Sequence, residues 1–146
     1  SKTKSIKLFP LEFSVCSDES GKPYMDGEHM ENIYVSLSHK NNTGVAVASD
    51  NGPVGIDLEE IKERDRDFID MLLSPAEERI AGVQNLPETL TRCWVAKEAF
   101  GKYLGKGLHG SPLNYVISQF NNDEFTIEDK KIKTIKYLNF IIGWTI

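Results

Sequence analysis

The stretch that decides the fold is "GPVGIDLEE", Gly52–Glu60, because its two faces have opposite character. Residues two apart lie on the same face of a β-strand, so one face here is apolar and the other carries Asp57 and Glu59 behind Gly55. The pattern predicts a strand with one face on a core and two carboxylates on the other, where the glycine leaves room for a close neighbour. A solvated strand face is an equal alternative, since like charges about 7 Å apart repel only mildly in water.

Two further strands are predicted immediately before this stretch. "IYVSLSH" at 33–39 alternates apolar and polar residues, and "GVAVAS" at 44–49 follows a turn rich in Asn and Gly. With 54–59 they predict a three-stranded antiparallel meander joined by short turns. The register of such a meander places His39 and Glu59 at the same end of the sheet, two strands and roughly 10 Å apart.

After residue 61 the apolar period changes to that of helices. One helix is predicted over 66–74, and a second begins after Ser74, which precedes proline and several acids and so suits the N-cap position. The longest helix is predicted over 87–105, with glycines at its end as the stop signal. Its apolar stripe consists of Cys93, Ala96, Phe100 and Leu104.

The chain returns to strand patterns at its end. Strands are predicted over 113–120, 124–127 and 131–146, while 18–28 is rich in Gly, Pro and acids and is predicted to be a loop. Strands, helices and strands in this order predict an α+β fold, with a mainly antiparallel sheet packed against helices. The length of 146 residues fits a single domain over 1–146.

Composition excludes several classes of function. The net charge of −5 argues against a nucleic-acid-binding protein, which needs a broad basic surface. Apolar runs are too short to cross a membrane, so no membrane association is expected. Cys16 and Cys93 lie far apart without metal-ligand spacing, which indicates two reduced thiols in a cytoplasmic protein rather than a zinc site.

The long helix carries a third acid. Trp94, Glu98 and Lys102 are spaced four apart and share one side of the helix. An exposed Glu98–Lys102 salt bridge is the simplest interpretation, and it would contribute only about 0.3–0.5 kcal/mol. Gly101 argues for more, because glycine within a helix costs about 1 kcal/mol relative to alanine and therefore indicates a close approach by another group.

Three carboxylates without further His or Cys do not suit zinc, whereas hard oxygen ligands suit Mg²⁺. The acids that could hold it are Asp57, Glu59 and Glu98. The cations that could complement the charge of a bound phosphate are Lys97, Lys102 and His39. The residues alone thus predict a Mg²⁺-dependent reaction at a pyrophosphate or nucleotide.

Four motifs in order resemble those of the Sfp-type 4′-phosphopantetheinyl transferases. They are "GKPY" at 21–24, "SLSH" at 36–39, "VGIDLE" at 54–59 and "WVAKEAFGK" at 94–102. The resemblance runs from about residue 21 to residue 107. It implies an enzyme that moves the phosphopantetheine arm of coenzyme A to a serine of an apo acyl or peptidyl carrier protein, with release of adenosine 3′,5′-bisphosphate.

The resemblance also implies roles for individual residues. The implied Mg²⁺ ligands are Asp57, Glu59 and Glu98, and Glu59 favours the Sfp-type class over the similar but smaller AcpS-type class. Glu98, or a metal-bound water, is the implied base for the serine, and Lys102 would stabilise the charge that develops on phosphate. The implied contacts to coenzyme A are Lys22, His39, Lys97 and Lys102. Lys97 lies about 100° around the helix from Glu98, so assisting orientation is an alternative role for it.

The chain departs from the Sfp-type pattern in its short N-terminal half. Lys2, Lys4 and Lys7 are candidates, without motif support, for the basic residues that would grip the nucleotide. Three explanations are open: a domain of a larger synthase, a compact form that completes its site by self-association into a homo-oligomer such as a trimer, or an inactive copy. Two other functions also remain, a non-catalytic carrier-docking or structural domain of a polyketide or fatty-acid synthase and a metal-dependent nucleotide hydrolase.

Overall fold

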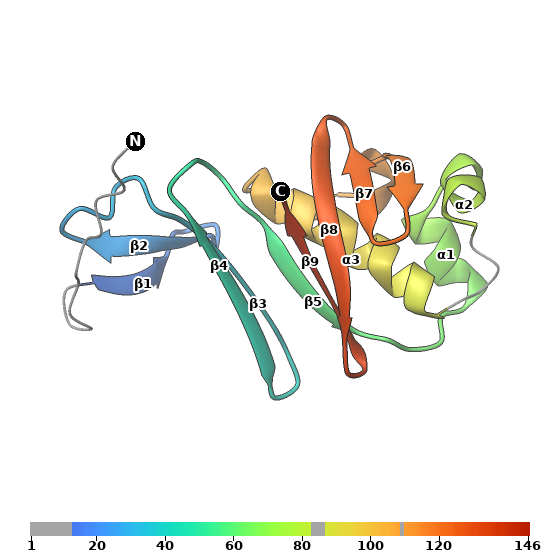
Figure 1. Ribbon diagram of the computed structural model, residues 1–146, viewed down its shortest axis with the longest axis horizontal. Helices are drawn as coiled ribbons and strands as arrows, with labels where there is room; N and C mark the ends of the chain where they lie inside the picture. Colours follow the sequence, from blue (N-terminus) through green and yellow to red (C-terminus); the bar gives the residue numbers. More distant parts are fainter. Residues whose placement is uncertain (1–12, 83–86, 109) are drawn as a thin grey trace.

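The computed structural model describes residues 13–82, 87–108 and 110–146. The lysines predicted to grip a nucleotide near the N-terminus, Lys2, Lys4 and Lys7, lie outside these ranges. The α+β class is confirmed, since antiparallel sheets pack against helices (Figure 1). None of the helices within the described ranges is long and apolar enough to span a membrane.

Nine strands and three α-helices make up the described part of the chain. In chain order they are β1 (Phe13–Ser17), β2 (Pro23–Gly27), β3 (Tyr34–Lys40), β4 (Thr43–Ser49), β5 (Ile56–Glu60), α1 (Arg66–Leu72), α2 (Pro75–Ala81), α3 (Pro87–Tyr103), the 3₁₀ turn η1 (Pro112–Asn114), β6 (Ile117–Asn121), β7 (Glu124–Ile127), β8 (Lys130–Tyr137) and β9 (Phe140–Thr145). The last four strands and β5 form one antiparallel sheet in the order β5-β9-β8-β7-β6.

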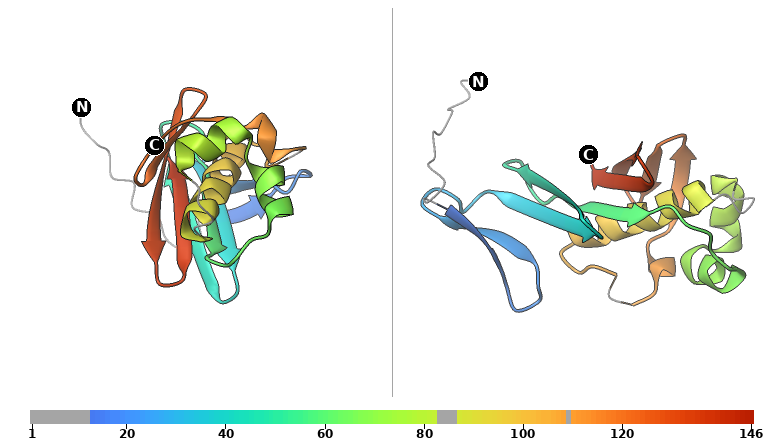
Figure 2. Two further views of the ribbon diagram at one scale, coloured as in Figure 1. Left: turned by 90° about the vertical axis from the view of Figure 1, so that its right-hand side faces the viewer. Right: turned by 90° about the horizontal axis from the view of Figure 1, so that it is seen from below.

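The sheet, α3 and the hairpins follow one another along the molecule. The β1–β2 and β3–β4 hairpins lie at one end, α1 and α2 lie at the other, and α3 runs along one face of the five-stranded sheet between them (Figures 1 and 2). Because α3 is one long helix on a sheet, its buried face forms the centre of the core. The core side chains include Leu72, Leu90, Cys93, Ala96, Phe100, Phe125 and Ile132.

Glycines allow α3 to approach the sheet closely. A Cβ on Gly55, just before β5, would collide with the carbonyl oxygen of Ala99 on α3. A Cβ on Gly143 of β9 would lie 2.6 Å from Cγ1 of Val95 on the same helix. The room predicted behind the carboxylate-bearing strand is therefore filled by the helix backbone itself.

The end of α3 is a tight glycine turn, as the sequence predicts. Gly105 and Gly107 have φ of 71° and 57°, in the left-handed region that glycine adopts most easily. The amides of Lys106 and Gly107 both donate to the carbonyl of Gly101. The turn passes so close that a Cβ on Gly101 would lie 2.5 Å from the Gly107 carbonyl oxygen, which confirms the close approach expected there. Leu104 lies beyond the helix and is 37% exposed, so its predicted place in the apolar stripe was wrong.

Ser74 caps α2 as predicted. Its hydroxyl accepts from the amide of Glu77, and the Glu77 carboxylate accepts from the amide of Ser74, which forms a capping box. Glu77 is nonetheless buried, with only 1% of the residue exposed. This acid therefore has a partner deeper in the protein.

The predicted three-stranded meander was wrong. β3 and β4 pair only with each other, while β5 pairs with β9, more than eighty residues further along the chain. The alternation of a strand tells which face is buried but not which strand lies at its edge, and the apolar β9 fills that position here. Two smaller predictions also failed: part of 18–28 is strand β2, paired with β1, and the last predicted strand is a β8–β9 hairpin that turns at Leu138, with φ of 53°.

Candidate functional site

The site lies where β3 runs beside the free edge of β5. No ladder of backbone bonds joins these two strands; serine side chains do so instead. The Ser36 hydroxyl accepts from the amide of Ile56 at 3.0 Å, and the Ser38 hydroxyl accepts from the amide of Leu58 at 3.2 Å. These hydroxyls satisfy edge donors of β5 that would otherwise be buried without an acceptor.

Asp57 is held from two sides at this junction. It is 6% exposed, and its Oδ1 accepts from Ser38 Oγ and from Lys102 Nζ, both at 2.8 Å. The same ammonium donates to the carbonyls of Leu37 on β3 and Ile56 on β5, each at 3.1 Å. Lys102 of α3 therefore ties both strands to the helix, and the predicted Glu98–Lys102 salt bridge is replaced by a Lys102–Asp57 pair.

Glu98 stands one helical turn before Lys102 and has no such partner. Within the described residues it makes no hydrogen bond and no ion pair. Burial, together with the negative charges of Asp57 and Glu59, raises the pKa of Glu98 to about 7. The charges of Asp57 and Glu59 are among the causes of this pKa shift, which places the three predicted acids near one another.

Glu59 forms an ion pair with Lys40, a residue that was not among the predicted site residues. Lys40, the last residue of β3, places its Nζ 3.2 Å from Oε1 and 3.4 Å from Oε2 of this carboxylate. The amide of Glu60 also donates to Oε1, at 3.0 Å. Glu59 is therefore neutralised by a neighbouring strand.

The partners of Asp57, Glu59 and Glu98 decide whether these acids can bind a divalent cation. Among the described residues, no three His, Cys, Asp or Glu side chains already stand in a metal-binding arrangement. Two of the three predicted acids are engaged by lysines, Asp57 by Lys102 and Glu59 by Lys40. The cluster still has one carboxylate without an ion-pair partner, Glu98, whose pKa is raised mainly by burial and further by the charges of Asp57 and Glu59. Oxygen donors with one unmet negative charge fit a hard cation such as Mg²⁺.

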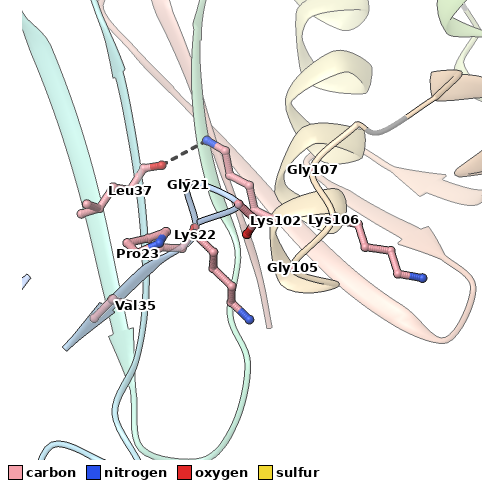
Figure 3. Close-up of a pocket in the computed structure, with 11 residues that line it drawn as sticks. Gly21, Lys22, Pro23, Val35, Leu37, Lys102, Gly105, Lys106 and Gly107 are labelled. Atoms are coloured by element: carbon pink, nitrogen blue, oxygen red, sulfur yellow. Dashed lines mark hydrogen bonds between the residues drawn. The ribbon is translucent and has the colours of Figure 1, made fainter. Parts of the chain in front are cut away.

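A cavity of about 200 Å³ opens directly beside Lys102. Three lysines from separate segments line it, Lys22 before β2, Lys102 on α3 and Lys106 in the glycine turn (Figure 3). Val35 and Leu37 of β3 form part of the wall. A small cavity lined by three lysines and an apolar wall suits an anion with an organic body, such as a phosphorylated cofactor. The Lys106 ammonium itself points away from Lys22 and Lys102 (Figure 3).

His39 lies on the face of β3 that carries Val35 and Leu37, because residues two apart share a face. Both of those residues line the cavity, and His39 is exposed beyond them. The predicted route to Glu59 through β4 does not exist, but β3 itself lies beside β5. His39 is therefore next to the residue that reaches Glu59, while its own side chain points to the opposite face.

Lys97 has a different environment from the other predicted cations. Its side chain is fully buried, with Nζ 2.7 Å from Oε1 of Glu77, and it also donates to the carbonyls of Leu72 and Pro112 at 2.7 and 3.1 Å. Burial lowers the pKa of this ammonium, and the bond to Glu77 opposes the shift. These contacts join α1, α2, α3 and the η1 turn, and they leave Lys97 turned away from the acids on β5.

Sequence reasoning missed several residues of the site. Lys40 directly follows the "SLSH" motif, and only the pairing of β3 beside β5 reveals its contact with Glu59. Ser38 lies inside that motif, yet its two bonds to β5 depend on a strand arrangement that differs from the predicted meander. Alternation along β3 was the available signal, since it places Ser36, Ser38 and Lys40 on one face.

A family model and the curated relatives of this chain agree on one family. The model of the 4′-phosphopantetheinyl transferase superfamily matches residues 53–145. A 4′-phosphopantetheinyl transferase of Bacillus subtilis is 31% identical over 109 residues, which are 72% of this chain and 47% of that protein. One from Bacillus pumilus is 34% identical over 122 residues, 76% of this chain and 46% of its own length. The chain thus spans about half the length of the curated relatives it matches.

Solved structures show the same fold. The holo-[acyl-carrier-protein] synthase of Thermotoga maritima superposes with a TM-score of 0.53 at 22% identity, over 64% of this chain and 61% of that one. The synthase of Bacillus anthracis, solved in complex with CoA (3′,5′-ADP), superposes with a TM-score of 0.52 at 20% identity, over 64% of this chain and 92% of that one. Since the matched family region holds β5, α3 and the whole five-stranded sheet, this chain belongs to the 4′-phosphopantetheinyl transferase superfamily.

Proposed function

We propose that the chain transfers the 4′-phosphopantetheine arm of coenzyme A to a serine of an apo acyl or peptidyl carrier protein. One observation carries the proposal: Lys102 both lines the lysine-rich cavity and binds Asp57 of the acid cluster. A single side chain thus links a pocket suited to a phosphorylated cofactor with acids suited to Mg²⁺. Membership of the superfamily supports the same reaction type.

The cavity would receive the phosphates of coenzyme A. Lys22 and Lys106 would bind phosphate oxygens from the two sides of the opening, and His39 would bind a further phosphate along the same face of β3. Lys102 would turn part of its hydrogen bonding from the backbone carbonyls to the pyrophosphate. The apolar wall of the cavity would cover the less polar part of the cofactor.

The acids would hold Mg²⁺ through Asp57, Glu59 and Glu98. When bound, this ion supplies charge neutralisation on the pyrophosphate oxygens. In the transfer, the serine oxygen forms a bond to the β-phosphorus, and the bond from that phosphorus to the bridging oxygen breaks, which releases adenosine 3′,5′-bisphosphate. Glu98 is the proposed acceptor of the serine proton, since a pKa near 7 suits a base at neutral pH. Lys102 stabilises the negative charge that grows on the phosphoryl oxygens.

Lys97 has no direct role in this proposal. It is buried against Glu77 and is bonded to two carbonyls, so it would fix the helix that carries Glu98 and Lys102 rather than touch coenzyme A. The contact to coenzyme A that the resemblance implies for Lys97 stays a prediction.

The decisive experiment is intact-protein mass spectrometry of an apo acyl carrier protein incubated with this chain, coenzyme A and Mg²⁺. A mass gain of one phosphopantetheine that EDTA abolishes supports the proposal. The matched variants are Lys102→Met, expected to lose transfer by at least about a hundredfold, and Lys131→Met, which removes an equal charge from β8 and should keep full transfer. No gain with any carrier would overturn the proposal for this chain alone.

Measurements of carrier binding and of free phosphate, made beside the mass assay, separate the alternatives. Carrier binding without transfer would indicate a non-catalytic docking domain, and release of phosphate without a carrier would indicate a nucleotide hydrolase. Because the chain spans about half of its curated relatives, the assay is repeated over a range of protein concentrations. Activity that rises more steeply than the concentration would indicate a site completed by self-association, and activity restored by a larger parent protein would indicate a synthase domain.

A further inference from the structure

Lys40 stands at the edge of the acid cluster, paired with Glu59, and has no role of its own in the proposed transfer. The Lys40 ammonium contacts both carboxylate oxygens of Glu59, at 3.2 and 3.4 Å. The Glu60 amide holds Oε1 of the same group from the chain side, at 3.0 Å. The Glu59 side chain is only 13% exposed, whereas that of Lys40 is 36% exposed. The acid is thus held inside the site while its cation reaches in from the solvent side.

The two lysines that engage the acids differ in what else they bind. Lys102 has two backbone carbonyl acceptors besides Asp57, and it also lines the cavity. Lys40 has no acceptor other than Glu59 among the described residues. If Lys40 leaves, its ammonium returns to water at little cost, because its side chain is already partly exposed. Lys40 is therefore the more easily displaced of the two.

We propose that Lys40 sets the affinity of the acid cluster for a divalent cation by holding Glu59 in a resting position. Lys40 contacts both oxygens of Glu59, so a divalent cation on either oxygen would meet this ammonium and be repelled by it. Lys102 bonds only Oδ1 of Asp57 and leaves the other oxygen of that carboxylate to a cation. Glu59 joins Asp57 and Glu98 as a ligand only when Lys40 moves out to solvent. This inference rests on the proposed function, since it concerns the metal ligands assigned there.

The test measures Mn²⁺ binding in the absence of coenzyme A, by the loss of the free-ion signal in electron paramagnetic resonance. Lys40→Gln is expected to bind Mn²⁺ about two- to fivefold more tightly than the unchanged chain, the size of effect that one partly exposed ion pair supports. The control is Lys131→Gln, which removes the same charge and a 2.9 Å ion pair with Glu124. This pair lies on β8 and β7, which are separated from β5 by β9, and the change should leave Mn²⁺ affinity unchanged. Equal or weaker binding by Lys40→Gln overturns the proposal.

A second pair of variants separates this role from a general effect of charge. In a Glu59→Gln background, Lys40→Gln should have no further effect on Mn²⁺ affinity, because the carboxylate that Lys40 holds is gone. A gain that persists in that background would come from charge alone and would overturn the proposal.

A structural readout accompanies the binding data. The amide of Glu60 reports directly on the Glu59 carboxylate, since it donates to Oε1. In ¹H–¹⁵N spectra of the unchanged chain, Mg²⁺ should shift this resonance as the carboxylate turns away, at a lower concentration in Lys40→Gln. A Glu60 amide that does not respond while Mg²⁺ binds would show that Glu59 stays in place, against the proposal.

Failure of this inference and failure of the transfer reaction are distinguishable. If the chain transfers phosphopantetheine but Lys40→Gln leaves Mn²⁺ affinity unchanged, only the role of Lys40 is wrong. If Mn²⁺ affinity rises as expected but no carrier is modified, the acid cluster is a metal site and the proposed reaction is wrong. Absence of Mn²⁺ binding in every variant overturns the role of Lys40.

Discussion

Replacing Lys97 by methionine tests the buried ion pair that joins the helices. The change removes the ammonium from Oε1 of Glu77, 2.7 Å away, and removes the donor to the carbonyls of Leu72 and Pro112. Both charged side chains are essentially inaccessible to solvent. The remaining carboxylate would then be a buried charge without its cation, although the amide of Ile117 still donates to it.

The expected loss is large for a single substitution. Removing one partner of a buried ion pair costs about 3–5 kcal/mol of the free energy of unfolding. For a chain near this length, each kcal/mol lowers the melting temperature by about 2–4 °C, which gives a decrease of about 6–20 °C. The double change Lys97→Met with Glu77→Gln should cost less than the single one, because no charge stays buried and the amide oxygen still accepts from Ile117.

Equilibrium urea unfolding at pH 7, followed by circular dichroism, measures these differences. The control is Lys131→Met, which breaks an exposed pair with Glu124 and should cost less than about 1 kcal/mol. A Lys97→Met variant no less stable than this control would refute the reasoning. So would a double variant that is less stable than the single one, since the cost could then not come from an unpaired buried carboxylate.

Three further outcomes are expected. The folded-state pKa of Glu98 is raised to about 7, so its contribution to stability is complete below its unfolded pKa near 4.5 and is lost as the pH rises through 7. The unchanged chain should therefore lose stability between pH 5 and pH 8. Glu98→Gln should lose less over the same range, as measured by urea unfolding with EDTA present. Alanine favours helices, yet Gly101→Ala should destabilise the protein by about 1–3 kcal/mol, because its Cβ meets the Gly107 carbonyl. Calorimetry should therefore give a lower melting temperature. An unchanged or higher melting temperature would show that the turn moves aside freely. Ser38→Ala should speed hydrogen exchange at the Leu58 amide and cost about 1–3 kcal/mol, whereas Ser38→Thr, which keeps the hydroxyl, should do neither.

The types of most elements follow from the sequence, because they depend on neighbours along the chain. Alternation placed β3 and β4 within one residue of their observed bounds, and the helical period with its glycine stop located α3. The partner of β5 could not be read in the same way. Its pairing with β9 depends on a strand at the far end of the chain, and the pattern of β5 is the same whichever strand lies beside it.

In the site, too, the faces on which residues lie could be predicted from the sequence, whereas contacts between distant segments could not. Asp57, Glu98 and Lys102 were recognisable because strand and helix geometry put each on a predictable face. The Lys102–Asp57 ion pair was not recognisable from the sequence. The spacing of four between Glu98 and Lys102 shows that these two are near each other, but not that Asp57 takes the lysine. Lys97 is the clearest example: helix position alone could not show that Glu77, on another helix, draws it into the core.

The junction between β3 and β5 has a consequence for how the protein can change. Backbone hydrogen bonds between two paired strands do not depend on a particular side chain, so most substitutions other than proline leave them in place. Here the attachment includes the hydroxyls of Ser36 and Ser38, the Lys40–Glu59 ion pair and the ammonium of Lys102. Single substitutions can therefore strengthen or weaken the attachment of the β3–β4 hairpin to β5 and α3, while the strands on either side keep their backbone structure.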